Sequence, residues 1–200
     1  MKSKIIAIAG LSGAGKSTVA ISLLDKYPEK FALVHLDDYF KKKIEIPTLF
    51  GMTNWDDPDA IDFEKMLGDL NQLITGHSIN IRTKSEKYNP QYHVTDTKIN
   101  YTIEPKPIII LEGYLSIWNQ TIRNIVEKSF FLTIDPAISI ARKTKTKNPE
   151  YEEKILIPMF KKHVKPTQQF ADYIIDVSIL TKQEVLEEIE SYLKSTKILA

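Results

Sequence analysis

The sequence predicts an α/β protein in which a mainly parallel, five-stranded sheet lies between two layers of helices. Short apolar runs rich in β-branched residues alternate with helical patterns, and a glycine-rich turn joins the first run to a helix. The apolar runs are almost continuous, as is typical of parallel strands that are buried on both faces. The expected strands are Lys4–Ala9, Ala32–Leu36, Ile108–Leu111, Phe130–Ile134 and Tyr173–Val177.

Composition limits the class of protein. The 200 residues are about the length of one domain, and 27 basic against 26 acidic side chains indicate neither a nucleic-acid partner nor a membrane surface. The sequence contains no cysteine, which excludes disulfides and cysteine-ligated zinc and agrees with a cytoplasmic location. No run approaches the roughly 20 apolar residues of a membrane span, and nothing indicates an oligomeric state.

Three helices have clear sequence signals. Residues 16–26 have a helical pattern directly after the glycine-rich turn. Asp62 can cap a second helix, which Gly76 would end. Thr181 and Glu184 form a capping box before a third amphipathic segment near the end of the chain.

Two segments interrupt the alternation of strands and helices. Residues 77–106 are polar, with short alternating stretches such as Tyr92 and Val94, and predict a small β-hairpin insertion on the substrate side. Residues 142–166 are rich in lysine and contain two prolines, which predicts a mobile helical lid. We therefore expect a single domain over residues 1–200 with two insertions.

The turn after the first strand matches the phosphate-binding motif G-x-x-x-x-G-K-[ST] over residues 10–17. The motif requires a strand before it and a helix after it, and both are predicted here. Its glycines let backbone N–H groups point at phosphate oxygens, and the following helix adds the positive end of its dipole. The predicted nucleotide-binding residues are Gly10, Ser12, Gly13, Ala14, Gly15, Lys16, Ser17 and Thr18. The fold class thus becomes a P-loop NTPase with a three-layer α/β/α architecture.

The motif also predicts the cofactors, ATP and Mg²⁺. Lys16 would contact the β- and γ-phosphates, and the Ser17 hydroxyl would bind Mg²⁺. A guanine-selecting Asn-Lys-x-Asp sequence is absent, which argues against a GTPase.

Two strand ends supply carboxylates for phosphoryl transfer. Asp37 follows the second apolar strand, and Glu112 ends the run of isoleucines at 108–110. Ligands of open α/β sheets bind at the carboxyl ends of the strands. A kinase needs a group that accepts the proton of the attacking hydroxyl, and Asp37 can do so. Glu112 can bind Mg²⁺ or its water ligands.

Four short motifs, in order and suitably spaced, resemble the uridine kinase and nicotinamide riboside kinase group of the phosphoribulokinase/uridine kinase family. The resemblance covers most of the chain. Its motifs are Asp37-Asp38-Tyr39-Phe40, Asn54-Trp55-Asp56-Asp57-Pro58-Asp59-Ala60, Glu112-Gly113 and the segment Gln168–Ile175, which lacks the family's first lysine.

The resemblance implies roles for individual residues. Asp37 would be the general base on the sugar 5′-hydroxyl, and Asp56 would bind the ribose 2′- and 3′-hydroxyls. Phe40 and Trp55 would pack against the sugar or the base. Ser17 and Glu112 would bind Mg²⁺.

The resemblance points to two nucleobases. Uridine kinases have a hairpin with Pro-x-Tyr-Asp and a later histidine; Tyr92 fits the tyrosine, Thr97 stands at the histidine position, and His93 is the displaced candidate. In the lid, Arg142 fits a family arginine that would clamp the transferring phosphoryl group, while lysines follow it. Residues 148–163 instead resemble the lid of nicotinamide riboside kinases.

We therefore expect an ATP-dependent ribonucleoside 5′-kinase that catalyses a uridine kinase-like reaction on a small-molecule nucleoside. A nicotinamide riboside kinase is the alternative. Two other readings stay open: a non-catalytic nucleotide-binding regulator, and a kinase for a phosphorylated or acidic small molecule, which predicts additional cations near Asp56 (candidates Arg82, Lys84 and Lys87).

Overall fold

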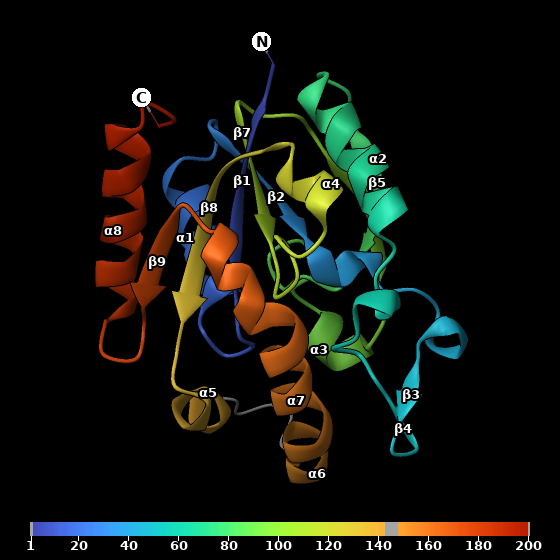
Figure 1. Cartoon of the computed structure of the whole chain (residues 1–200). Helices are drawn as coiled ribbons and strands as arrows, with labels where there is room; N and C mark the ends of the chain where they lie inside the picture. Colours follow the sequence, from blue (N-terminus) through green and yellow to red (C-terminus); the bar gives the residue numbers. More distant parts are fainter. Residues whose placement is uncertain (1, 143–147, 200) are drawn as a thin grey trace.

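A computed structural model describes residues 2–142 and 148–199. Its centre is a five-stranded sheet with the order β2-β7-β1-β8-β9, in which every neighbouring pair is parallel (Figure 1). The strands are β1 (Lys4–Gly10), β2 (Phe31–His35), β7 (Ile108–Glu112), β8 (Val126–Thr133) and β9 (Tyr173–Asp176). All five predicted strands are confirmed, with ends that shift by up to a few residues.

Helices cover both faces of this sheet. Helix α1 (Lys16–Lys26) packs against α8 (Lys182–Ser195), and α2 (Phe63–Ile74) contacts the short α4 (Gln120–Arg123) on the other side (Figure 1). β1 and β7 are buried along almost their whole length, and their apolar side chains belong to one core cluster with residues of α1, α2 and α8. The predicted caps at Asp62 and Thr181 are present, the latter as a full capping box with Glu184.

The predicted insertion at 77–106 is an antiparallel hairpin of β5 (Ile79–Thr83) and β6 (Ile99–Ile103). The expectation of strand at Tyr92 and Val94 is wrong, because both residues lie in the one-turn helix α3 (Tyr92–Thr95). Pro90 precedes this turn; a proline has no N–H to donate to a strand partner, which favours a turn over continued pairing. A further two-stranded ribbon, β3 (Thr48–Leu49) and β4 (Met52–Thr53), follows β2.

The lid segment is helical where the structure describes it. After α5 (Pro136–Arg142), helical turns run through α6 (Pro149–Tyr151), α7 (Ile157–Met159) and two wider π-helical stretches at 152–156 and 160–164, then a 3₁₀ stretch at 165–170. Pro158 lies inside this run, where it removes a backbone donor; the flanking π turns are the irregularities that accompany it. The lid and the β3–β4 ribbon lie beyond the carboxyl ends of the strands (Figure 1). The β5–β6 hairpin lies beside β2 and α2, and α3 at its tip also reaches this end of the sheet.

Candidate functional site

The phosphate-binding loop has the backbone that its glycines predict. Gly10 and Gly13 have φ values of 138° and 88°, in the region that side chains rarely adopt. A Cβ atom on Gly13 would lie 2.8 Å from the backbone oxygen of Ser139 in α5, and one on Gly10 would lie 2.3 Å from that of Leu132 in β8. The loop can therefore fit between β8 and α5 only with glycine at these two positions.

The loop opens into a cavity of about 920 Å³, at the upper end of the usual size of ligand pockets. Four parts of the chain form its walls: residues 12–18 of the loop, the end of β2, the hairpin that carries Lys84 to Glu86 and Tyr92, and the end of β7. Arg142 and the residues around the start of α8 complete it. The space is large enough for a nucleotide together with a small acceptor.

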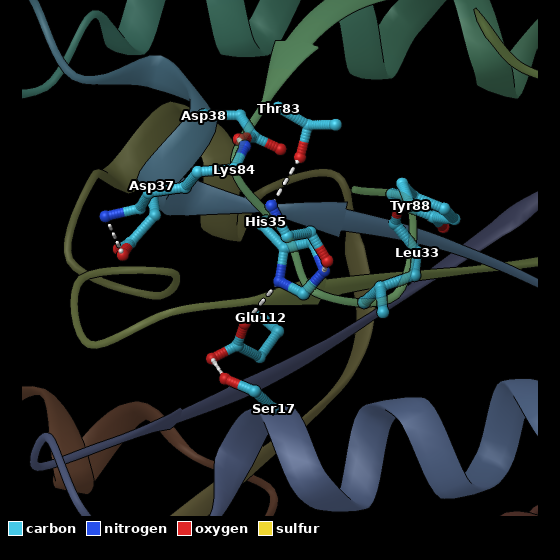
Figure 2. Close-up of polar contacts among 10 residues, drawn as sticks. Ser17, Leu33, His35, Asp37, Asp38, Thr83, Lys84, Tyr88 and Glu112 are labelled. Carbon is cyan, nitrogen blue, oxygen red and sulfur yellow. Dashed lines mark hydrogen bonds and ion pairs between the residues drawn. The ribbon is translucent and has the colours of Figure 1, made fainter. Parts of the chain in front are cut away.

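Ser17 and Glu112 meet in this cavity, as their predicted metal-binding role requires. The Ser17 hydroxyl donates a hydrogen bond of 2.9 Å to Glu112 Oε1, and both residues lie at the edge where β7 ends (Figure 2). One hydroxyl and one carboxylate suit Mg²⁺, which takes oxygen ligands and usually keeps several waters and substrate phosphates. No group of three or more acidic, histidine or cysteine residues arranged to bind a metal occurs within residues 2–142 and 148–199.

Lys16 is buried, and its ammonium group donates to the Leu11 carbonyl at 3.1 Å, which holds its side chain within the loop. The remaining predicted nucleotide-binding residues, from Ser12 to Thr18, also line the cavity, whereas Gly10 lies at the base of the loop at the end of β1.

His35 joins Glu112 to the hairpin, a connection that the sequence analysis missed. Its Nδ1 lies 2.8 Å from Glu112 Oε2 and its Nε2 lies 2.7 Å from the Ser85 hydroxyl. Figure 2 shows Ser17, Glu112 and His35 in a row. Burial lowers the pKa of His35, but the hydrogen bond and charge of Glu112, together with the charges of Asp38 and Asp37, outweigh burial and raise the pKa. The row fixes the Glu112 carboxylate from both of its oxygens.

Asp37 lies in the same cavity and pairs with a lysine of the hairpin. Lys84 Nζ lies 3.0 Å from Asp37 Oδ2, and the backbone N–H of Lys84 donates to Asp38 Oδ1 at 3.3 Å (Figure 2). Burial raises the pKa of Asp38, although its hydrogen bonds to the hairpin act in the opposite direction. Burial also lowers the pKa of Lys84, yet the charge and hydrogen bond of Asp37, together with the charges of Tyr92 and Asp38, outweigh this effect and raise the pKa, so the lysine is a cation at neutral pH.

Phe40, Trp55 and Asp56 form a second group, which is not part of the cavity wall. The rings of Phe40 and Trp55 meet edge to face, with centroids 5.2 Å apart. Tyr114 lines the cavity, and its hydroxyl donates a hydrogen bond of 2.6 Å to the Trp55 carbonyl. The second group therefore lies next to the cavity, with Tyr114 between them.

The lid reaches this second group through Tyr151. Its hydroxyl donates to Asp56 Oδ2 at 2.7 Å and accepts from the Trp55 N–H at 3.0 Å. Burial and the charge of Asp56 raise the pKa of Tyr151, so the phenol keeps its proton. Neither Tyr114 nor Tyr151 was predicted from the sequence, because each acts through a partner more than fifty residues away.

The other predicted site residues take different positions. Tyr92 lines the cavity from α3, whereas His93 is exposed and does not. The role predicted for His93 remains a prediction that its position does not support. Arg142 lines the cavity and donates to the Val177 carbonyl at 3.0 Å. The lid residues 143–147, where lysines were predicted to replace arginines, lie outside the described residues.

The described parts of the chain contain no helix that is long and apolar enough to cross a bilayer.

Several bacterial uridine kinases are similar in sequence to this chain. The uridine kinase of Lactobacillus helveticus is 31% identical over 87% of this chain and 86% of its own length, and that of Halalkalibacterium halodurans is 30% identical over 86% and 84%. The uridine kinase of Streptococcus gordonii is 28% identical over 96% of this chain and 97% of its own length.

Solved structures share the fold. A structure described as that of "a Possible Uridine Kinase" from Bacillus stearothermophilus has a TM-score of 0.64 at 19% identity and covers 88% of this chain and 90% of its own. Phosphoribulokinase from Rhodobacter spheroides has a TM-score of 0.63 at 10% identity over 88% of this chain and 73% of its own. The family model named Phosphoribulokinase / Uridine kinase family matches residues 5–183. The family model and the similar sequences agree, and the chain belongs to the phosphoribulokinase/uridine kinase family of kinases.

Proposed function

We propose that this chain is an ATP-dependent ribonucleoside 5′-kinase of the cytoplasm, with uridine or cytidine as the preferred acceptor. The observation that carries the proposal is that the phosphate-binding loop, the candidate base Asp37 and the Ser17–Glu112 pair line one cavity. A protein that only binds nucleotides has no need of a carboxylate base at that position.

The reaction follows from these positions. Asp37 takes the proton of the acceptor 5′-hydroxyl while the 5′-oxygen of the acceptor attacks the γ-phosphorus. The bond from that phosphorus to the oxygen of ADP then breaks. Lys16 and Arg142 neutralise charge on the phosphates. Mg²⁺ at Ser17 and Glu112 would neutralise further negative charge on the nucleotide. Positioning and electrostatic stabilisation account for most of the rate of phosphoryl transfer.

The acceptor would lie between Asp37 and Asp56. A carboxylate suits a vicinal diol, because its two oxygens accept hydrogen bonds from both hydroxyls. In the structure described here, the Tyr151 hydroxyl donates to Asp56, which is the kind of bond that a ribose hydroxyl would make. Phe40 and Trp55 lie beside this carboxylate and offer an apolar surface to the sugar or base.

The hairpin favours a pyrimidine over a pyridine nucleoside. It adds Lys84, Ser85 and Tyr92 to the cavity wall, at the side where Asp37 would receive the acceptor. The relatives described above as uridine kinases match this chain over most of its length, the hairpin included.

The test is product formation from Mg·ATP with uridine, cytidine or nicotinamide riboside. We expect turnover of uridine or cytidine by the wild type and its loss in Asp37→Asn, with Mg·ATP binding retained. The matched control is Asp25→Asn, an exposed aspartate of α1 that pairs with Lys87 and should leave turnover unchanged. Turnover of nicotinamide riboside alone would identify the other acceptor. ATP binding without turnover of any nucleoside would indicate a regulator or another acceptor class.

A further inference from the structure

Lys84 provides a cation on the acceptor side of the cavity, opposite the phosphate-binding loop. Its ammonium nitrogen lies 3.0 Å from Asp37 Oδ2, and its side chain lines the cavity that Lys16 and Ser17 also line. Any group that hydrogen-bonds to Asp37 would therefore lie within a few ångström of this cation, since such bonds are about 2.7–3.0 Å long.

The backbone around Lys84 is fixed on both sides. Thr83 is fully buried, and its hydroxyl accepts from the Ser85 N–H at 2.9 Å. The Lys84 N–H donates to Asp38, and the Ser85 hydroxyl contacts His35. A lysine in such a position is preorganised, in contrast to one on a free loop, because its main chain is bonded to the end of β2.

Two other lysines of the hairpin differ from Lys84. Lys87 is exposed, lines no part of this cavity and pairs with Asp25 on the outside of α1. Lys98 is half-buried, and burial lowers its pKa, with Lys84 and Arg82 adding repulsion. Among these three lysines, Lys84 alone both lines the cavity and contacts the candidate base.

We propose that Lys84 is a catalytic residue of the phosphoryl transfer, which binds Asp37 before the reaction and the transferring phosphoryl group during it. This inference rests on the proposed kinase function. As the acceptor O–H bond breaks, its proton moves to the Asp37 carboxylate, which loses its negative charge and with it most of its attraction for Lys84. The acceptor oxygen bonds to the γ-phosphorus, the bond to the ADP oxygen breaks, and ADP leaves with that electron pair.

Through these steps Lys84 keeps all its protons and acts only as a charge. Negative charge moves from Asp37 toward the phosphoryl oxygens, and the ammonium group can follow it by a small side-chain rotation. Interactions that strengthen only in the transition state raise kcat rather than lower KM. The lysine would thus supply, from the hairpin, positive charge that P-loop kinases need around the phosphoryl group.

The experiment compares Lys84→Ala and Lys84→Arg with the control Lys87→Ala, using Mg·ATP and whichever nucleoside the wild type phosphorylates. We expect Lys84→Ala to lower kcat about 10²-fold, as loss of one transition-state donor does, with KM for both substrates changed little. Lys84→Arg should recover at least a tenth of the lost rate, methylammonium should partly rescue Lys84→Ala, and Lys87→Ala should match the wild type.

A binding measurement separates catalysis from packing. Lys84→Ala should bind the analogue formed by ADP, aluminium fluoride and the nucleoside about 10²-fold more weakly, with the Kd for ADP unchanged. Should this variant fail to fold, Lys84→Met, which keeps the aliphatic stem, takes its place in both assays.

Some outcomes overturn the inference. A kcat within threefold of the wild type, or an analogue affinity that falls only as much as ADP affinity does, would make Lys84 a structural partner of Asp37. A loss that appears only in the nucleoside KM would make it a binding residue instead. If the wild type phosphorylates no nucleoside, the proposed function fails and this inference fails with it; active wild type with active Lys84→Ala overturns the inference alone.

Discussion

The bond between Tyr151 and Asp56 tests how the lid is held on the acceptor side. Tyr151→Phe removes one hydroxyl that donates to a carboxylate at 2.7 Å and accepts from the Trp55 N–H at 3.0 Å. A hydrogen bond to a charged group contributes about 1.5–3 kcal/mol and a neutral one about 1 kcal/mol. Both partners are partly exposed, so water replaces part of what is lost.

The expected loss of unfolding free energy is therefore about 1–2 kcal/mol, or a Tm lower by about 2–8 °C for a chain of this size. The lid is part of the core, because Leu156, Phe160 and Val164 are buried in it, so global unfolding reports its attachment.

The assay is a double-mutant cycle in urea with Tyr151→Phe, Asp56→Asn and the double variant. We expect a coupling free energy of about 1 kcal/mol, well above the additivity error of about 0.3–0.5 kcal/mol. The matched control pairs Tyr151→Phe with Asp62→Asn, because Asp62 is a partly exposed helix cap that accepts from the Lys65 N–H instead. Additive changes for the Tyr151 and Asp56 pair would refute the reasoning, since the two groups would then not interact in solution.

Three further predictions follow from single sites. Gly13→Ala should abolish Mg·ATP binding in equilibrium titrations, because its Cβ would lie 2.8 Å from a backbone oxygen of α5 at a φ of 88°; binding within tenfold of the wild type would contradict this. Asp172 has a lowered pKa, because hydrogen bonds from Lys128 and Ser129 outweigh the effect of burial. The ionised Asp172 stabilises the folded protein at pH values above the pKa that this group has in the unfolded chain. This stabilisation disappears as the pH falls through the lower pKa of the folded state. Asp172→Asn should thus destabilise the protein at pH 7 in urea titrations, and the difference from the wild type should shrink as the pH falls below 3.8; a constant difference would contradict this. Asp56→Ala should raise KM for ribonucleosides much more than for 2′,3′-dideoxy analogues, and an equal effect on both would exclude a diol contact.

Local sequence determined much of the fold. The predicted sheet strands, the cap at Asp62 and the capping box at Thr181 are all present, and the hairpin predicted within 77–106 has strands between residues 79 and 103. Each depends on side chains within a few residues of one another, where periodicity and capping chemistry act directly. The exception was Tyr92 and Val94, where alternation predicted a strand and the turn after Pro90 gave a helix.

The phosphate-binding loop was also readable from the sequence, because its function lies in its own backbone. Glycines with positive φ, Lys16 and Ser17 occupy consecutive positions, so one strand and one helix suffice to arrange them. Glu112 could be predicted as well, since parallel strands bring their carboxyl ends to one edge of the sheet.

Only the tertiary structure decided how the acceptor side is built. His35 meets both Glu112 and Ser85, Lys84 meets Asp37, and Tyr151 meets Asp56, and the partners lie 47 to 95 residues apart in the sequence. No periodicity encodes these pairs. Lys84, Ser85 and Tyr151 come from the hairpin and the lid, whose positions depend on how they dock on the sheet, and His35 and Glu112 meet because β2 and β7 are neighbouring strands. The sequence alone thus determined the fold and the backbone of the phosphate-binding loop, and packing between distant segments determined which side chains surround Asp37 and Asp56.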